Sequence, residues 1–196
     1  MNDKRAVLLA ACMSSFITPF LSSSVTVALP AINSDFSIPD QSLLGWIMTG
    51  YLLAAAIFIV PFGRVADIHG RRRVFLAGLL MVVVSSLLCS ISSGVYMLIA
   101  SRMMEGLGSA MIFGTSIAIL ASVFPQQKRG RVLGINVAAA YLGLSTGPLL
   151  GGIITSYAGW RFIYLGVAVY SLLALAIARW KIREEWRCAQ EGEFDA

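Results

Sequence analysis

The sequence contains six stretches of apolar residues, each long enough to cross the hydrocarbon core of a membrane. A core about 30 Å thick takes about 20 residues of α-helix to cross. Lipid offers the backbone no hydrogen-bond partners. A segment that is not part of a closed barrel therefore crosses the membrane as a helix, whose backbone groups bond to one another. We therefore predict an all-α integral membrane protein, a six-transmembrane-helix bundle without β-structure, with spans at about 6–32, 42–62, 74–92, 95–124, 132–157 and 160–180.

Composition excludes a soluble domain. Hydrophobic residues make up 58% of the chain, charged residues 13%, and the mean hydropathy is +0.80. A soluble domain has roughly a quarter of its residues charged. We expect residues 1–183 to form the membrane bundle. The stretch 184–196 is acidic, and we expect a cytoplasmic tail or the start of a linker to further helices there.

The net charge of +5 is a topology signal. Basic residues gather before the first span, between the second and third, between the fourth and fifth, and after the sixth. The other three connections, which join the first span to the second, the third to the fourth and the fifth to the sixth, contain one arginine in total. They are 33–41, 92–94 and 156–161. The positive-inside rule predicts cytoplasmic termini in a multi-pass protein of the plasma membrane. We expect no nucleic-acid partner. The basic residues are Lys4, Arg5, Arg64, Arg71, Arg72, Arg73, Lys128, Arg129, Arg131, Arg179, Lys181, Arg183 and Arg187.

Signals for processing, metal binding and catalysis are weak. The first apolar stretch, about 25 residues long, exceeds the usual 7–15 residues of a signal peptide, so we expect it to be retained as a span. Cys12, Cys89 and Cys188 show no metal-ligand spacing, and His69 is the single histidine. We expect no metal, no cofactor and no enzyme activity, since no nucleophile–base arrangement is present.

The connection between the second and third spans, "GRVADIHGRRR" (63–73), carries an unusual density of charge. It resembles the signature loop of the major facilitator superfamily, G-x-x-x-D-x-x-G-[RK]-[RK]. One departure is Ile68, where that family usually has a basic residue. The matching residues are Gly63, Asp67, Gly70, Arg71 and Arg72.

The resemblance implies that this loop is a conformational latch. A carboxylate such as Asp67 is stabilised at the N-terminus of a helix, where unpaired N–H groups and the dipole favour an anion. In the family the helix belongs to the other half of the transporter, and the contact is thought to hold the outward-facing state. Glycines permit a tight turn and a close approach of helices.

Two further motifs extend the resemblance. "SRMMEGLGSA" (101–110) is similar to the fourth-helix motif R-x-x-Q-G-x-G-x-A, with glutamate in place of the usual glutamine. "GLSTGPLLGG" (143–152) matches the fifth-helix motif of antiporters at Gly143, Gly147, Pro148, Gly151 and Gly152. The stretches 26–32, 46–54 and 159–164 resemble drug exporters of the fourteen-helix branch.

Arg102 and Glu105 are ionisable residues within the fourth span. Such groups cost roughly 2.5–3.5 kcal/mol each on insertion scales. Three residues apart, they lie on one helical face and can partly neutralise each other. They are candidates for proton coupling, or they form a structural pair. Snorkelling of Arg102 to the outer interface is a further possibility.

The first span departs from the drug-exporter pattern, which carries an aspartate where this chain has Leu21. The first span instead carries a face of hydroxyl side chains. We expect this face either to line a cavity or to form hydrogen bonds between helices. Glu105 is then the only carboxylate we place inside a span. The polar face consists of Ser15, Thr18, Ser22 and Thr26.

The fifth span carries a stripe of small residues at every fourth position: Ala139, Gly143, Gly147 and Gly151. Such a stripe lets another helix approach closely. Pro148 cannot donate to the carbonyl of Leu144 and is expected to kink the helix. By resemblance, the stripe and the latch loop are surfaces that meet the opposite half of a transporter.

The resemblance implies the N-terminal half of a proton-coupled multidrug exporter, with hydrophobic or cationic small molecules as substrates. Superfamily transporters bind substrate between two parallel six-helix bundles, so we expect a second half as partner. A homodimer is less favoured because it would duplicate Arg102 and Glu105. Two alternatives stay open: another solute transporter of the superfamily, working by symport or uptake, and a truncated or split fragment that does not transport by itself.

Overall fold

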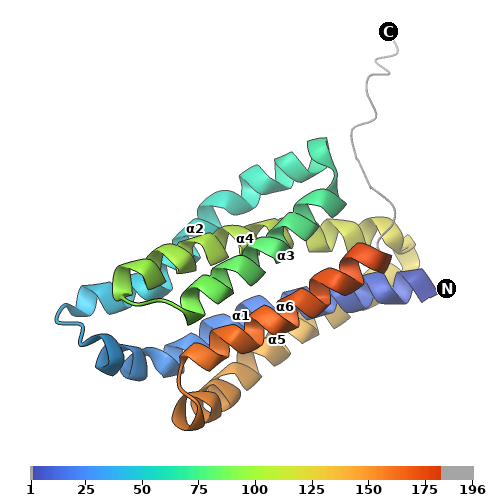
Figure 1. Ribbon diagram of the computed structural model, residues 1–196. Coiled ribbons are helices and arrows are strands. Elements are labelled where there is room, and N and C mark those ends of the chain that lie inside the picture. The colour runs from blue at the N-terminus through green and yellow to red at the C-terminus, as the bar shows by residue number, and fades with distance from the viewer. Residues whose placement is uncertain (1, 182–196) are drawn as a thin grey trace.

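The computed structural model describes residues 2–181, which form six α-helices (Figure 1). No strand occurs among these residues, and the prediction of an all-α six-helix bundle is confirmed. Arg183, Arg187, Cys188 and the acidic stretch 184–196 lie outside the described residues. The helices are α1 (Asn2–Phe36), α2 (Gln41–His69), α3 (Arg71–Ser90), α4 (Val95–Val123), α5 (Gln126–Tyr157) and α6 (Arg161–Lys181).

All six helices are long and apolar enough to cross a membrane. They run up and down, so their connections alternate between two ends of the bundle (Figure 1). We call the end with the N-terminus and the α2–α3 and α4–α5 connections the basic end, because Arg64, Arg71 and Arg129 lie there. The other end, with connections 37–40, 91–94 and 158–160, is called the opposite end. The protein is a multi-pass membrane protein.

Two helices extend further at the basic end than the sequence predicts. Helix α2 continues through Gly63 to His69, and the only residue between α2 and α3 is Gly70, with φ +103°. Glycine adopts this backbone conformation without a steric penalty. Helix α5 begins at Gln126, so most of the stretch 125–131, predicted as a loop, is helical. Charged residues at these ends let the helices continue beyond the apolar spans.

Helix α2 begins at the opposite end with a side-chain cap. Asp40 accepts hydrogen bonds from the backbone N–H of Ser42 at 2.8 Å and from its hydroxyl at 2.7 Å. These bonds satisfy one of the unpaired amides of the first turn. They also stabilise the carboxylate and lower the pKa of Asp40.

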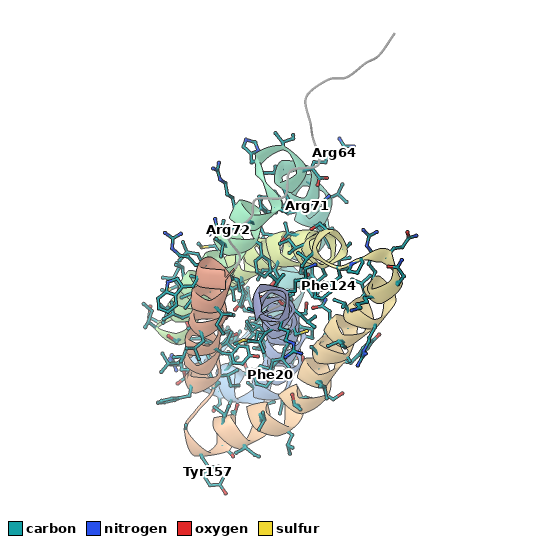
Figure 2. The ribbon with its side chains drawn as sticks, turned by 90° about the vertical axis from the view of Figure 1, so that its right-hand side faces the viewer. Phe20, Arg64, Arg71, Arg72, Phe124 and Tyr157 are labelled. Atoms are coloured by element: carbon teal, nitrogen blue, oxygen red, sulfur yellow. The ribbon has the colours of Figure 1, made fainter. Side chains whose placement is uncertain are left out.

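Helix α1 lies in the middle of the bundle (Figure 2). It packs against α5, α6 and α4, while α4 also packs against α2 and α3. In the most apolar window of α1, α3 and α4, 44–50% of the residues are buried, against 22% in α2 and 17% in α5. Helices α2 and α5 are therefore the flanks that leave most apolar surface uncovered.

The glycine stripe of α5 is the contact between α5 and α1. A Cβ atom on Gly143 would collide with the carbonyl oxygen of Phe16, and one on Gly151 would come within 2.8 Å of Cα of Ser24. Ser24 donates a hydrogen bond to the carbonyl of Gly147 at 3.0 Å. The expectation that this stripe meets an opposite half is wrong: α1 of the same bundle covers it.

The other residues of the fifth-helix motif lie beside this contact. Gly152 is half-buried, and a Cβ there would sit 3.7 Å from Val27. Pro148 is exposed on the other face of α5. The helix continues through it from Gln126 to Tyr157.

The close α1–α5 contact predicts that Gly147→Ala destabilises the fold. The added Cβ would lie 2.7 Å from the carbonyl oxygen of Phe20 and would also collide with Ser23. Overpacking of this kind costs about 1–3 kcal/mol. Thermal unfolding of the purified chain in detergent should show a lower midpoint.

The matched control is Gly134→Ala in the same helix, where no atom lies within 4 Å of an added Cβ. This change should be neutral or stabilising by up to about 1 kcal/mol, because alanine is the better helix former. Equal melting of Gly147→Ala and Gly134→Ala would contradict the packing described above.

Candidate functional site

Arg102 and Glu105 form an ion pair in the buried interior of the bundle. Nη1 of Arg102 lies 2.7 Å from Oε2 of Glu105, and their side chains are 0% and 1% exposed. The spacing of three residues places both on the inner face of α4, as the sequence predicts. The suggestion that Arg102 snorkels to an interface is wrong, because its side chain is fully buried.

Neighbouring helices hold the pair in place. The hydroxyl of Ser86 in α3 donates to Oε1 of Glu105 at 2.8 Å. From α2, the carbonyl of Ile47 accepts from Nε of Arg102 at 3.3 Å. The guanidinium carbon also lies 4.4 Å from the ring centroid of Tyr51, a cation–π contact. The pair on α4 thus ties together α2, α3 and α4.

One nitrogen of this site has no partner. Nη2 of Arg102 is buried and makes no hydrogen bond to any described residue. The hydroxyl of Tyr164, on α6, is also buried and without a hydrogen-bond partner in the described part of the chain. Buried polar atoms without partners are rare and need an explanation. The guanidinium therefore retains a donor that no described residue accepts from.

Half of the polar face predicted on the first helix, Ser15 and Thr18, bonds helix to helix. Ser15 donates to Oδ1 of Asn136 in α5 at 3.0 Å. Thr18 lies 3.4 Å from the hydroxyl of Ser109 in α4, which also accepts from Tyr51 at 3.2 Å. These hydroxyls connect α1, α2, α4 and α5 in the apolar interior.

The remainder of the polar face differs. Ser22 is half-buried, and Thr26 is exposed and donates to the carbonyl of Ser22 at 3.0 Å. Leu21, at the position where a carboxylate was expected by resemblance, is 2% exposed and packs in the apolar core. Glu105 is the one buried acidic side chain among residues 4–180.

The loop motif forms a compact structure at the basic end. Asp67 accepts from Nε of Arg71 at 3.0 Å and lies 2.9 Å from its Nη2. Arg71 also donates to the carbonyl of Ala118 in α4, at 3.4 Å. Arg72 donates to the carbonyl of Arg179 near the end of α6, at 3.3 Å. Figure 2 shows Arg64, Arg71 and Arg72 together on this side of the molecule.

The carboxylate of Asp67 stays half exposed at 51%. The partner of Asp67 in this bundle is therefore Arg71 of the same motif. The exposed part of the carboxylate remains accessible for a second contact. The other glycine of the motif, Gly63, lies where α2 and α4 come close: a Cβ on Gly114 would be 3.5 Å from its backbone nitrogen. The role of the loop as a latch stays a prediction.

Sequence reasoning missed several residues of the site. Tyr51, Ser86, Ser109 and Asn136 were not singled out, although all are buried polar residues in apolar spans. A polar side chain inside a span is itself a signal, because lipid gives it no partner. The carbonyl of Ile47 gives no such signal in the sequence, because every residue has a backbone carbonyl.

The chain matches the family model described as Major Facilitator Superfamily over residues 11–187. It is 37% identical over 177 residues to the cephamycin export protein CmcT of Amycolatopsis lactamdurans, covering 87% of this chain and 36% of that protein. It is 32% identical over 165 residues to the riboflavin transporter RibZ of Clostridioides difficile (strain 630), covering 84% of this chain and 36% of the relative.

A third relative is the multidrug resistance protein Stp of Mycobacterium tuberculosis (strain CDC 1551 / Oshkosh), 35% identical over 84% of this chain and 31% of its own length. The chain thus spans about a third of the length of these curated relatives. The fold resembles a solved bacterial homologue of the human lysosomal transporter Spinster. The TM-score is 0.81 at 20% identity, over 98% of this chain and 46% of that one.

The buried ion pair predicts an asymmetry between single and double replacement. Glu105→Leu leaves the guanidinium of Arg102 buried without a counter-charge, and breaking a buried pair in this way costs about 3–5 kcal/mol. The double variant Arg102→Met/Glu105→Leu removes both charges and should recover most of that loss. Thermal unfolding in detergent measures both.

Ser86→Ala is the control, since it removes one hydrogen bond to Glu105 and keeps the charges. It should cost about 1–3 kcal/mol. A double variant as unstable as Glu105→Leu would show that the two charges are not energetically coupled.

Proposed function

The chain belongs to the major facilitator superfamily, and from that membership we propose that it forms the N-terminal half of a proton-coupled exporter of small molecules, working by alternating access. The observation that carries the proposal is the buried carboxylate of Glu105, paired with Arg102 at 2.7 Å. Intramembrane ionisable residues mark ion and substrate pathways. The names of two relatives, a cephamycin export protein and a multidrug resistance protein, support export.

Protonation of Glu105 would act directly on helix packing. The carboxylate holds Nη1 of Arg102 and accepts from Ser86, while Arg102 holds the carbonyl of Ile47. A proton on Glu105 removes the counter-charge of Arg102, whose Nη2 already lacks a hydrogen-bond partner. We infer that Arg102 has other partners in a second conformation, so that protonation of Glu105 shifts the equilibrium and the proton gradient biases one state over the other.

We place the substrate between this bundle and a second six-helix unit. In the superfamily, sites lie near the bilayer midplane at the interface of two parallel bundles. Helices α2 and α5 expose large apolar residues, among them Phe58 and Leu149, and a second bundle would cover such flanks. Of the polar face of α1, Ser22 and Thr26 remain candidates to line the cavity, since Ser15 and Thr18 are bonded to neighbouring helices.

The substrate class is proposed from the family resemblance, and the multidrug resistance protein among the relatives supports a range of small molecules. Hydroxyl groups and apolar surface suit hydrophobic or cationic small molecules, and we propose that class. The basic end faces the cytoplasm of a plasma membrane by the positive-inside rule. A second candidate function is solute transport of another kind, which the riboflavin transporter among the relatives favours.

The test is gradient-driven transport in everted vesicles. Cross-linking in native membranes first identifies the second six-helix unit. The chain is then expressed with that unit and alone, and an imposed pH gradient drives ethidium transport. Glu105→Gln should abolish the gradient-driven component in the assembly, because the neutral amide cannot exchange a proton. Glu105→Asp, which keeps a carboxylate, should retain part of it.

Equal gradient-driven transport by Glu105→Gln and the parent would assign Glu105 to structure. Efflux from the chain alone while it stays monomeric would overturn the half-transporter proposal. Uptake in place of export, measured in right-side-out vesicles with riboflavin, would favour the second candidate function.

Asp67→Asn tests the latch in the same assembly. The change removes the charge that Arg71 contacts and that a helix N-terminus of the second unit would stabilise. We expect unchanged insertion and a fall in transport of about 5- to 30-fold, equivalent to 1–2 kcal/mol. Asp40→Asn is the control, because asparagine caps a helix as well as aspartate does. Full transport by Asp67→Asn at equal expression would remove the latch from the mechanism.

A further inference from the structure

A groove runs between α5 and α6, with α1 as its floor. Its inner part is an apolar hollow of about 300 Å³. Figure 2 shows α5 and α6 on either side of α1, with Phe20 labelled between them. The hollow is lined by aliphatic and aromatic side chains from all three helices, among them Phe16, Phe20, Leu150, Ile154, Gly166 and Tyr170.

The shape of this hollow follows from two features of the sequence. Gly166 carries no side chain, and no atom lies within 4 Å of the Cβ it lacks. The rings of Phe16 and Phe20 stack at a centroid distance of 5.5 Å, and the ring of Tyr170 lies 5.8 Å from Phe16. The rings of Phe16, Phe20 and Tyr170 line one part of the hollow, and Gly166 leaves space at another part because it has no side chain.

A second hollow, of about 420 Å³, lies at the opposite end, beside the connection between α5 and α6. The two are adjacent along α6, since Phe162 lines the second hollow and Ile163 the first. Near the end of α5, Ile154 lines the first hollow and Ala158, one helical turn later, lines the second. The groove thus has an apolar hollow within the span and a second hollow at the opposite end, which forms its mouth. On α1 the nearest lining residues of the two hollows, Phe20 and Ala31, are eleven residues apart.

The mouth of the groove carries one charge of each sign. Asp35 forms an ion pair with Arg161 and accepts from Nε1 of Trp160 at 3.2 Å. Arg161 also donates to the carbonyl of Ser92 at 3.0 Å and stacks over the ring of Trp160 at 4.3 Å. The side chains of Asp35 and Arg161 stay 43% and 38% exposed. The pair is fixed in position and open to a ligand.

We propose that this groove binds a zwitterionic phospholipid of the surrounding membrane. One acyl chain occupies the apolar hollow, the phosphate lies beside Arg161, and the ammonium group lies beside Asp35. The groove is apolar inside and carries one positive and one negative charge at its mouth. A zwitterionic phospholipid has the same arrangement, with apolar acyl chains and a head group that carries both charges. An anionic head without an ammonium group can place its phosphate beside Arg161 but offers no positive charge to Asp35.

The site is separate from the proposed transport chemistry. It lies on the α5–α6 side of α1, whereas the ion pair of Arg102 and Glu105 binds α2 and α3. Lipid binding needs neither a second bundle nor a proton gradient. With the basic end in the cytoplasm, the lipid belongs to the outer leaflet.

The experiment measures lipid retained by the full chain. The protein is reconstituted in vesicles of equal parts phosphatidylethanolamine and phosphatidylglycerol, extracted in mild detergent and examined by native mass spectrometry. One phosphatidylethanolamine should stay bound, enriched about fivefold over phosphatidylglycerol, as one charged contact of about 1 kcal/mol gives. Gly166→Leu adds a side chain at the lining of the hollow, where a Cβ meets no atom within 4 Å, and should lower retained lipid about tenfold.

Two variants complete the test. Gly45→Leu, at the same end on α2 and likewise without atoms within 4 Å of its Cβ, should retain lipid as the parent does. Asp35→Asn should retain a lipid but lose the preference for phosphatidylethanolamine. Equal retention by Gly166→Leu and Gly45→Leu, no enrichment in the parent, or displacement of the lipid by ethidium at the same site would overturn the proposal.

Discussion

The lack of water in the hydrocarbon core governs this structure, because every polar group there needs a partner within the chain. The backbone meets that demand as helices, and serine and threonine hydroxyls meet it by donating to carbonyls one turn earlier, as Ser14 does to Ala10 at 2.7 Å. The ion pair meets it only in part, since Nη2 of Arg102 has no hydrogen-bond partner among the described residues. One of the buried polar atoms without a hydrogen-bond partner therefore lies in the candidate site.

Glycine contacts determine where that site can form. Lipid provides no hydrophobic drive for helices to associate, so close backbone approach at small residues takes its place. A Cβ on Gly106 would collide with the carbonyl of Tyr51 and lie 2.9 Å from Ala54. This approach of α2 to α4 brings the ring of Tyr51 and the carbonyl of Ile47 to the guanidinium of Arg102. The glycines of the fourth-helix motif thus position the charges of the same motif.

The sequence predicts the number of spans, their order and the shared face of Arg102 and Glu105, because these depend on local length and helical period. It does not predict which helix a face meets. The stripe of Gly143, Gly147 and Gly151 was expected to meet another half, and it packs on α1. Snorkelling of Arg102 was one of the expectations, but the side chain is buried, because α2 supplies the carbonyl of Ile47 and the ring of Tyr51 from far away in sequence. Tertiary partners of this kind leave no periodic signal in one sequence.

The exchange of a first-helix carboxylate for Leu21 changes where a proton would act under the proposed function. Leu21 is buried in the apolar core, and the hydroxyls of Ser15 and Thr18 keep α1 bonded to α5 and α4 whatever the protonation state. Glu105 contacts α3 through Ser86 and reaches α2 through Arg102. Under that proposal a proton there would loosen α2 against α4 and leave the α1–α5 contact intact. Helix α2 ends at the loop of Asp67 and Arg71, so the same movement reaches the proposed latch at the basic end.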